Sequence, residues 1–289
     1  MRRQITPLRY LSLGTLIALT TFSAQTFALD IDIHALSEAP IVDGNGHDWQ
    51  KTPAHNIPVR HTININNTDI QYLTLKAGYY RDRIFFYLRW KDDDPGPIHK
   101  PFTWDQKQQR YINSNKREDR LAMQFAISGD YNSDWRSGNT FTADMWHWKS
   151  SRSNPLGLAH DKYTIVSRKK IPRAYTLSSH NGDTIYLRRI SDQGNPLYST
   201  RRYYEKQQEE MPKYILQPKT AGSIADVEAK GIWNNGIWEL EFSRKLDTQH
   251  DDDVAFRLQK PIRSGIAIFD NSDDDHHFVS PTISFTLQP

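Results

Sequence analysis

The segment TADMWHWKS, Thr142 to Ser150, concentrates side chains that can bind iron or line a cofactor site. If the segment is a strand, Met145 and His147 share one face while Trp146 and Trp148 share the other. Methionine and histidine are both ligands of haem iron. Neighbours on one strand face stand about 6–7 Å apart and point the same way, so these two cannot fill both axial positions of one iron. A second axial ligand must come from elsewhere in the chain.

Two adjacent histidines near the C-terminus are the candidates for that second ligand. His276 and His277 lie in DDDHHFVS, Asp273 to Ser280, just before the last expected strand. Adjacent residues of an extended segment face opposite sides, so only one of the pair is expected to reach a shared site. The alternative is a solvated acidic turn with two exposed histidines.

Other ligand and catalytic patterns are weaker. Met123 lies in a regular strand pattern, where core packing is favoured, and Met211 and Lys213 lie in a polar region without a supporting motif. The runs KDDDP (91–95) and HDDD (250–253) could hold Ca²⁺, but they lack the spacing and central glycine of a defined loop, so turns are favoured. No G-x-S-x-G, H-E-x-x-H or Walker-type motif occurs, so we do not predict an enzyme.

The elements that must position these residues are strands. Apolar and polar residues alternate with a period of two in residues 70–80, 83–90, 119–127, 226–233, 236–244, 265–270 and 282–287. The turn signal NNG, Asn234 to Gly236, joins two of these strands as a hairpin. No long segment has a helical period. The sequence therefore predicts an all-β fold, a β-sandwich or barrel with few short helices.

One region departs from this alternation. Residues 162–219 are rich in Arg, Tyr, Gln and Glu and poor in apolar periodicity. We expect a long polar insertion, or arm, that packs over the sandwich, because a loop of that length usually covers a site or a partner surface.

The first residues have the order of a secretory signal peptide. Arg2, Arg3 and Arg9 precede an apolar stretch over residues 10–24, which small residues follow. We expect a signal peptide over residues 1–28, a single domain over residues 29–289, and a location in the periplasm. An uncleaved N-terminal anchor is the alternative. The apolar stretch is shorter than the roughly 20 residues that a helix needs to span a bilayer, and no second such stretch occurs.

Charge and cysteine content exclude several functions. The net charge of +3 comes from 37 basic and 34 acidic side chains, and the expected leader contains three arginines and no acid. The rest is close to neutral, so nucleic-acid binding is not predicted. The absence of cysteine excludes disulfides, thiolate metal sites and the covalent attachment of a c-type haem.

Several segments, in chain order, resemble the haem-binding domain related to the gamma subunits of ethylbenzene dehydrogenase and dimethylsulfide dehydrogenase. The W-H-W-K block together with W-E-L-E-F-S-R-K-L-D-T is the most specific part, and only the polar region is skipped. The segments are IVDGNGHDWQKTP (41–53), FFYLRWKDDDP (85–95), REDRLAMQF (117–125), ADMWHWKSSRSNPLGLAHD (143–161), GIWNNGIWELEFSRKLDTQHDDDVAF (231–256) and GIAIFDNSDDDHHFVS (265–280).

The resemblance implies one non-covalent b-type haem in a periplasmic protein that exchanges electrons with a redox partner, either an oxidoreductase subunit or a c-type cytochrome. In the best-known gamma subunits, a methionine and a lysine hold the iron. This sequence has no methionine in DWRSGNTFT (134–142), where that ligand would fall, and two histidines near the position of the lysine.

Relatives with similar W-H-W-K and H-H-x-x-S patterns imply His147 and His277 as the axial pair, with Met145 and His276 as the alternatives. Trp146 and Trp148 would form an aromatic wall that excludes water, and ordinary packing is the alternative for them.

The opening strand also resembles that of family 9 carbohydrate-binding modules, which implies an immunoglobulin-like or carbohydrate-binding-module-like sandwich. It provides a second hypothesis, a glycan-binding protein with exposed Trp and Tyr platforms. A third is a member of the gamma-subunit family that has lost haem and docks to a partner through residues 162–219.

Overall fold

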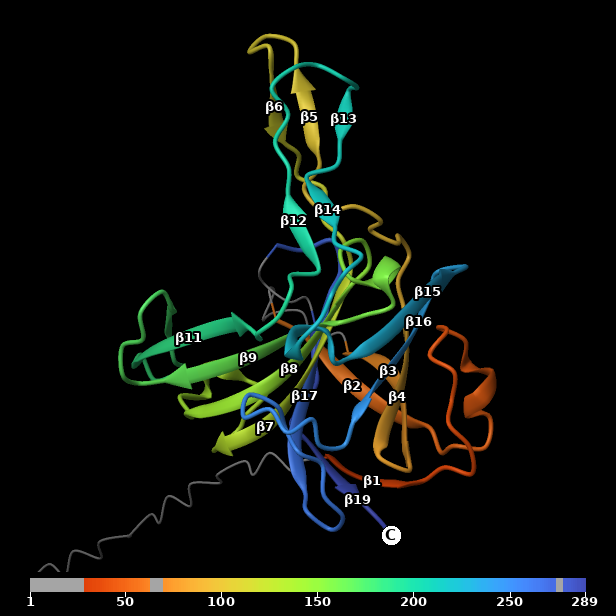
Figure 1. Ribbon diagram of the computed structural model, residues 1–289. Coiled ribbons are helices and arrows are strands. Elements are labelled where there is room, and N and C mark those ends of the chain that lie inside the picture. Colours follow the sequence, from red (N-terminus) through yellow and green to blue (C-terminus); the bar gives the residue numbers. More distant parts are fainter. Residues whose placement is uncertain (1–28, 63–69, 274–277) are drawn as a thin grey trace, which may run out of the picture.

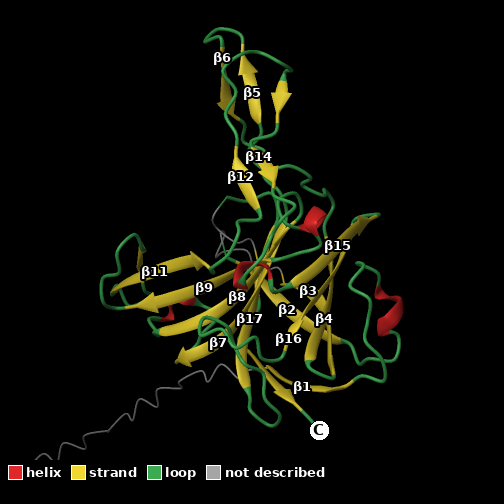
Figure 2. Cartoon of the chain, in the orientation of Figure 1, coloured by secondary structure: helices red, strands yellow, loops and turns green. Residues whose placement is uncertain are grey.

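The computed structural model describes residues 29–62, 70–273 and 278–289. Almost all regular structure in these ranges is β, and helix is limited to short 3₁₀ turns, as Figure 2 shows. None of the helices found there is long and apolar enough to cross a membrane. The 3₁₀ turns are Gly46–Trp49, Trp135–Ser137, Asn154–Leu156 and Ser223–Ala225.

The strands are β1 (Leu29–Ala35), β2 (His55–His61), β3 (Ile70–Tyr80), β4 (Arg83–Lys91), β5 (Phe102–Asp105), β6 (Arg110–Asn113), β7 (Arg120–Gly129), β8 (Phe141–Lys149), β9 (His160–Ser167), β10 (Tyr175–Ser178), β11 (Thr184–Ser191), β12 (Tyr198–Thr200), β13 (Glu210–Met211), β14 (Tyr214–Leu216), β15 (Glu228–Asn234), β16 (Ile237–Lys245), β17 (Ile262–Phe269), β18 (Phe278–Val279) and β19 (Ile283–Leu287).

Most of these strands belong to one large sheet that curls on itself (Figure 1). Its main path runs β10-β11-β9-β8-β7-β17-β18-β2-β3-β4-β16-β15. The strand β1 lies beside the path, parallel to both β19 and β3, and β19 also pairs with β17. The curl brings β4 and β16 opposite β7 and β8, so the predicted β-sandwich is confirmed.

The core lies between these two halves. Phe125 of β7 and Trp146 of β8 have ring centroids 4.7 Å apart, and Phe86 of β4 lies 5.8 Å from Trp146. Trp148 of β8 lies 4.9 Å from Trp238 of β16. Burying large aromatic and aliphatic side chains is the main favourable term in the free energy of folding.

The strands predicted from alternation are all present within a few residues. The NNG signal also forms the predicted hairpin between β15 and β16, whose register pairs Asn234 with Ile237. Asn235 and Gly236 have φ values of 49° and 79°. Two successive positive φ values are what a tight turn between right-twisted strands requires, and Asn-Gly adopts them readily.

The prediction of one polar insertion over residues 162–219 is corrected by the structure. β9, β10 and β11 extend the main sheet beyond β8. Only the later part leaves the sandwich, where β12 pairs with β14, and β13 pairs with β5, which in turn pairs with β6. Figure 1 shows these small sheets as a projection, which we call the arm. The arm therefore combines residues 198–216 with residues 102–113, which the sequence did not connect.

A cluster of charged side chains lies inside the sandwich. Arg244 of β16 is fully buried and donates to Asp144 of β8 at 2.5 Å, with Asp253 at 3.3 Å and Asp161 at 3.9 Å. Asp192 is also buried, and neither of its carboxylate oxygens has a hydrogen-bond partner. Burial first, and then Asp252 and Asp144, raise the pKa of Asp192 to about 8.

Glu241 of β16 holds the segment between β1 and β2 against the sheet through hydrogen bonds. Its carboxylate accepts from the backbone N–H groups of Asp43 at 3.0 Å, Gly44 at 2.7 Å and Asn45 at 3.3 Å, and from the indole Nε1 of Trp49 at 2.6 Å. Glu241 is 1% exposed, so these donors replace the water molecules that would otherwise hydrogen-bond to its carboxylate.

Candidate functional site

β8 has two faces with different surroundings, as its alternation predicts. Trp146 and Trp148 belong to the main core, whereas Met145 packs in a separate cluster with Ala122, Ala267 and Phe269 on the other side of the sheet. The register places Met145 opposite Gln124 and His147 opposite Ala122, both on β7. We call this other side the outer face of β8.

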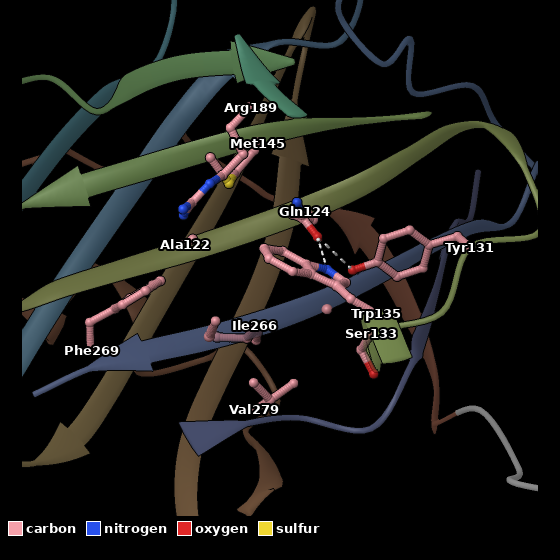
Figure 3. A pocket seen from close by; sticks show the side chains of 12 residues that line it. Ala122, Gln124, Tyr131, Ser133, Trp135, Met145, Arg189, Ile266, Phe269 and Val279 are labelled. Carbon is pink, nitrogen blue, oxygen red and sulfur yellow. Dashed lines mark hydrogen bonds between the residues drawn. The ribbon is translucent and has the colours of Figure 1, made fainter. Parts of the chain in front are cut away.

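A cleft lies on the outer face beside Met145. Its lining includes the small residues Ala122, Gly265 and Ala267. Tyr131, Ser133 and Trp135, from the segment between β7 and β8, lie at one end of the cleft (Figure 3). Gln124 Oε1 accepts from Trp135 Nε1 at 3.2 Å. The complete lining is Ala122, Gln124, Tyr131, Ser133, Trp135, Met145, Arg189, Gly265, Ile266, Ala267, Phe269 and Val279.

His147 is the chemically unusual residue of the outer face. Its side chain lies against the ring of Phe269, with 5.5 Å between centroids, and the residue is 3% exposed. Neither ring nitrogen has a hydrogen-bond partner. Burial holds the pKa of His147 well below its usual range, and the positive charge of Lys162 adds to the effect. The imidazole is therefore neutral, and leaving its nitrogens unpaired costs about 1–3 kcal/mol each unless a ligand uses them.

Lys149 is the next residue on this face, and the sequence did not single it out. It is 1% exposed, and its Nζ lies 2.6 Å from Nδ1 of His160 and 3.3 Å from the hydroxyl of Tyr198. His160 Nε2 lies 2.9 Å from Ser191 Oγ. Burial lowers the pKa of Lys149 well below its usual range and that of His160 likewise. Its spacing of two residues from His147 was the signal in the sequence that places Lys149 on the same strand face.

The other predicted site residues are distributed as follows. Trp146 and Trp148 are not among the residues that line the cleft, because their strand positions turn them into the core. Met123 is a core residue. His276 and His277 lie outside the described residues. The chain is described again from Phe278, and Val279 lines the cleft.

The donor set of the outer face fits haem iron. A neutral imidazole nitrogen and a thioether sulfur are established axial donors, and both are present in His147 and Met145. Arg189 lines the cleft and would offset the charge of a propionate. The enclosed space is about 20 Å³, enough for about one water molecule. A macrocycle therefore requires the cover formed by residues 131–135 to open.

A larger hollow, about 530 Å³, lies between β1 and residues 36–53. Its lining includes His34, Glu38, His47 and Asp48, all exposed, and contains no Phe, Tyr or Trp. It offers hydrogen-bonding groups without an aromatic platform.

The chain belongs to the ethylbenzene dehydrogenase family, whose sequence pattern matches residues 46–278. No curated protein sequence matches it significantly. Among solved structures, a candidate carbohydrate-binding protein from Bacteroides uniformis ATCC 8492 is similar with a TM-score of 0.45 and 8% identity, covering 91% of this chain and 100% of the other. A family 9 carbohydrate-binding module from Caldicellulosiruptor kristjanssonii, in complex with glucose, is similar with a TM-score of 0.39 and 10% identity, covering 90% and 95%. These structural similarities are too distant to carry a functional argument.

Proposed function

We propose that this protein is an electron-transfer subunit or partner of an oxidoreductase and binds one non-covalent b-type haem on the outer face of β8. The observation that carries the proposal is His147, a buried neutral imidazole whose two nitrogens have no partner. Membership of the ethylbenzene dehydrogenase family supports an association with an oxidoreductase.

The residues of this face have distinct roles in the proposal. His147 supplies a nitrogen ligand, with Met145 as the alternative from the same strand face. Ala122 and Ala267 leave room for a flat group, because neither side chain extends beyond Cβ. Phe269 shields His147 from water, which lowers the local dielectric constant. The positive charges of Lys162 and Arg189 lower the pKa of His147. They also favour a bound molecule that carries negative groups over one that carries positive groups.

Haem iron would supply reversible one-electron transfer. The protein's part is to hold a neutral donor in a fixed orientation and to keep solvent out. The rigid pairing of β8 with β7 and β9 provides that orientation, because His147 sits in the middle of three hydrogen-bonded strands.

The test is a haemin titration of the purified protein followed by the Soret band. We expect wild-type protein to bind haemin with about one equivalent, and His147→Ala to lose the band or shift it strongly. His250→Ala is the matched control, since His250 pairs with Asp226 in another part of the molecule. Met145→Leu distinguishes the two donors of the face. The single variants His276→Ala and His277→Ala examine the opposite axial position that the sequence predicts.

A wild-type protein that binds no haemin would overturn the proposal. Retention of the wild-type spectrum by both His147→Ala and Met145→Leu would place the cofactor elsewhere.

We also propose a periplasmic location, supported by the order of Arg2, Arg3, Arg9 and the apolar stretch that follows them. Cell fractionation and the mass of the mature N-terminus test it. The redox partner would be an oxidoreductase subunit or a c-type cytochrome, and co-purification with such a protein is the expected result.

Glycan binding has less support on this surface. It needs exposed aromatic platforms, but none of the eight tryptophans, all of which are described, is exposed. The exposed aromatic residues within the described ranges are Tyr72, Tyr175 and Tyr204. A docking role without haem predicts that substitution of His147 leaves binding to the partner intact, which a pull-down with the variant would measure.

A further inference from the structure

Three acidic side chains from separate strands meet at one end of the sandwich. Asp92 follows β4, Asp119 precedes β7, and Asp270 follows β17. Each offers a carboxylate oxygen within 4.8 Å of the other two. Asp92 is 5% exposed and Asp119 is 1% exposed. We call these residues the Asp92 triad.

The hydrogen bonds of the triad leave one buried oxygen without a partner. Asp119 Oδ1 accepts from the backbone N–H of Asn271 at 3.2 Å, and its Oδ2 accepts from Trp238 Nε1 at 3.2 Å. Asp92 Oδ1 accepts from the N–H of Asp94 at 3.1 Å, but Asp92 Oδ2 has no donor. Because a buried carboxylate oxygen is costly to leave unpaired, this atom indicates a missing cationic or donor group.

No basic side chain of the described residues pairs with Asp92 or Asp119. The interior cluster of Asp144, Asp161 and Asp253 differs, because Arg244 lies among those carboxylates. Burial first, and then repulsion from Asp119 and Asp270, raise the pKa of Asp92 to about 7. Asp92 and Asp119 thus have no basic partner among the described residues, whereas Arg244 partly neutralises the interior cluster.

Neutral oxygens lie next to the triad because Gly96 has no side chain. A Cβ at Gly96 would lie 2.7 Å from the carbonyl oxygen of Arg117, 2.9 Å from Asn271 Oδ1 and 3.0 Å from Asp119 Oδ1. A side chain at position 96 would clash with these oxygens, so glycine allows them to lie close together. Carboxylate, amide and carbonyl oxygens together are the ligand set of hard cations.

We propose that Asp92, Asp119 and Asp270 bind a divalent cation of the Ca²⁺ class. Oxygens on opposite sides of Ca²⁺ stand about 4.6–5.2 Å apart, twice a bond of about 2.3–2.6 Å. The three carboxylate oxygens all lie within 4.8 Å of one another, close enough to share one such ion. The cation would join the end of β4 to the ends of β7 and β17. Arg120 and Phe269, the neighbours of two triad residues in the chain, stack on each other at 4.4 Å, so it would also fix the strand ends beside His147. The proposal does not rest on haem binding.

The experiment uses the full chain without haemin, with Tb³⁺ and Ca²⁺ as the probes. Trp238 donates to Asp119, so excitation of tryptophan should sensitise Tb³⁺ luminescence at this site. We expect Ca²⁺ to displace Tb³⁺. At about 100 times its dissociation constant, Ca²⁺ should raise Tm by roughly 5–10 °C. Mg²⁺ should have a smaller effect, because it requires shorter bonds and octahedral geometry.

Asp92→Asn is the decisive variant. It should lose both the luminescence and the Ca²⁺-dependent rise in Tm. In EGTA it should unfold at the same temperature as wild type or a higher one, since one repelling charge has been removed, so loss of binding is separable from loss of folding. Asp93→Asn is the matched control, because Asp93 is exposed and pairs with Lys91 at 3.4 Å. It should behave as wild type.

Three results would overturn the assignment. They are a wild-type protein that does not respond to Ca²⁺, an Asp92→Asn variant that responds as wild type does, and an Asp93→Asn variant that loses the response. A response to Mg²⁺ equal to that to Ca²⁺ would contradict the Ca²⁺ class. Failure of the haemin titration leaves all of these outcomes unaffected.

Discussion

Lys149 Nζ lies 2.6 Å from His160 Nδ1, and both side chains are buried. If His160 Nε2 carries the proton and donates to Ser191 Oγ, its Nδ1 can accept from an uncharged Lys149. Burial disfavours the charged form of both side chains, which allows two basic residues to share this space.

This pair predicts a pH-dependent gain in stability. The pKa of Lys149 is lowered in the folded state, so the unfolded state binds an extra proton at every pH between the folded and unfolded values. Stability therefore rises as pH increases toward 10.5, by about 1.4 kcal/mol per pH unit from this group. Urea unfolding at pH 8 and pH 10 should show wild type gaining stability relative to Lys149→Met, by up to about 2.8 kcal/mol over these two pH units. Lys91→Met, at an exposed position, controls for removal of one positive charge. Parallel pH profiles for wild type and Lys149→Met would contradict the prediction.

Asp192 predicts the opposite dependence on pH, a free energy of unfolding that falls as pH rises. Its folded pKa is raised to about 8, so the folded state holds a proton that the unfolded state has released. The cost to the fold grows as pH rises from about 4 to about 8 and then levels off. Asp192→Asn loses no hydrogen bond, because neither carboxylate oxygen has one. Its free energy of unfolding relative to wild type should increase by at least about 1 kcal/mol between pH 5 and pH 8. The exposed Asp251→Asn should differ from wild type by less than about 0.5 kcal/mol throughout.

The two faces of β8 predict opposite effects of substituting Trp146 and His147 on stability and on haemin binding. Trp146→Leu removes contacts with Phe86 and Phe125 in the core and should lower the free energy of unfolding by about 2–4 kcal/mol. The folded fraction should still bind haemin. His147→Leu should lose haemin binding while its apo-protein is at least as stable as wild type, because an unpaired buried polar group is removed. Loss of haemin binding in folded Trp146→Leu would contradict the assignment of the faces.

Glu241 predicts that one carboxylate stabilises a whole segment. Glu241→Ala leaves the N–H groups of Asp43 and Gly44 and the indole of Trp49 without their acceptor, so we expect a loss of about 3 kcal/mol. Glu241→Gln retains one acceptor oxygen and should lose less. Chemical denaturation measures the loss, and proteolysis within residues 36–53 should accelerate in the same order. Equal stability of the Ala and Gln variants would show that packing alone holds the segment.

Much of the fold could be predicted from local patterns. The strands β4, β7 and β16 combine clear alternation with β-branched or aromatic residues, and the Asn-Gly turn between β15 and β16 has a specific backbone requirement. The faces of β8 followed from strand geometry alone. β9 and β11 were missed because half-buried charged residues, such as Lys162 and Arg188, interrupt the apolar alternation along these strands.

The parts that were not predicted depend on contacts between distant residues. Nothing local in residues 102–113 indicates that they pair with residues 210–211 to form the arm. The Asp92 triad is hidden for the same reason, since its members come from three strand ends that only the folded sheet brings together. The run KDDDP contained one ligand candidate, and the sequence offered no means of finding the other two.

The parallel pairing of β1 with β19 has a consequence for how the protein is made. Leu29 pairs with Ile283 and Ile33 with Leu287, so the first and last described strands complete each other. A growing polypeptide leaves the ribosome with β1 long before β19, and pairing between such distant segments is slow to form. The curled sheet therefore cannot close until β19 has been synthesised. Nascent chains that stall within β19 would display an unpaired strand edge and the apolar side chains of Ile31 and Ile33, features that chaperones and proteases recognise.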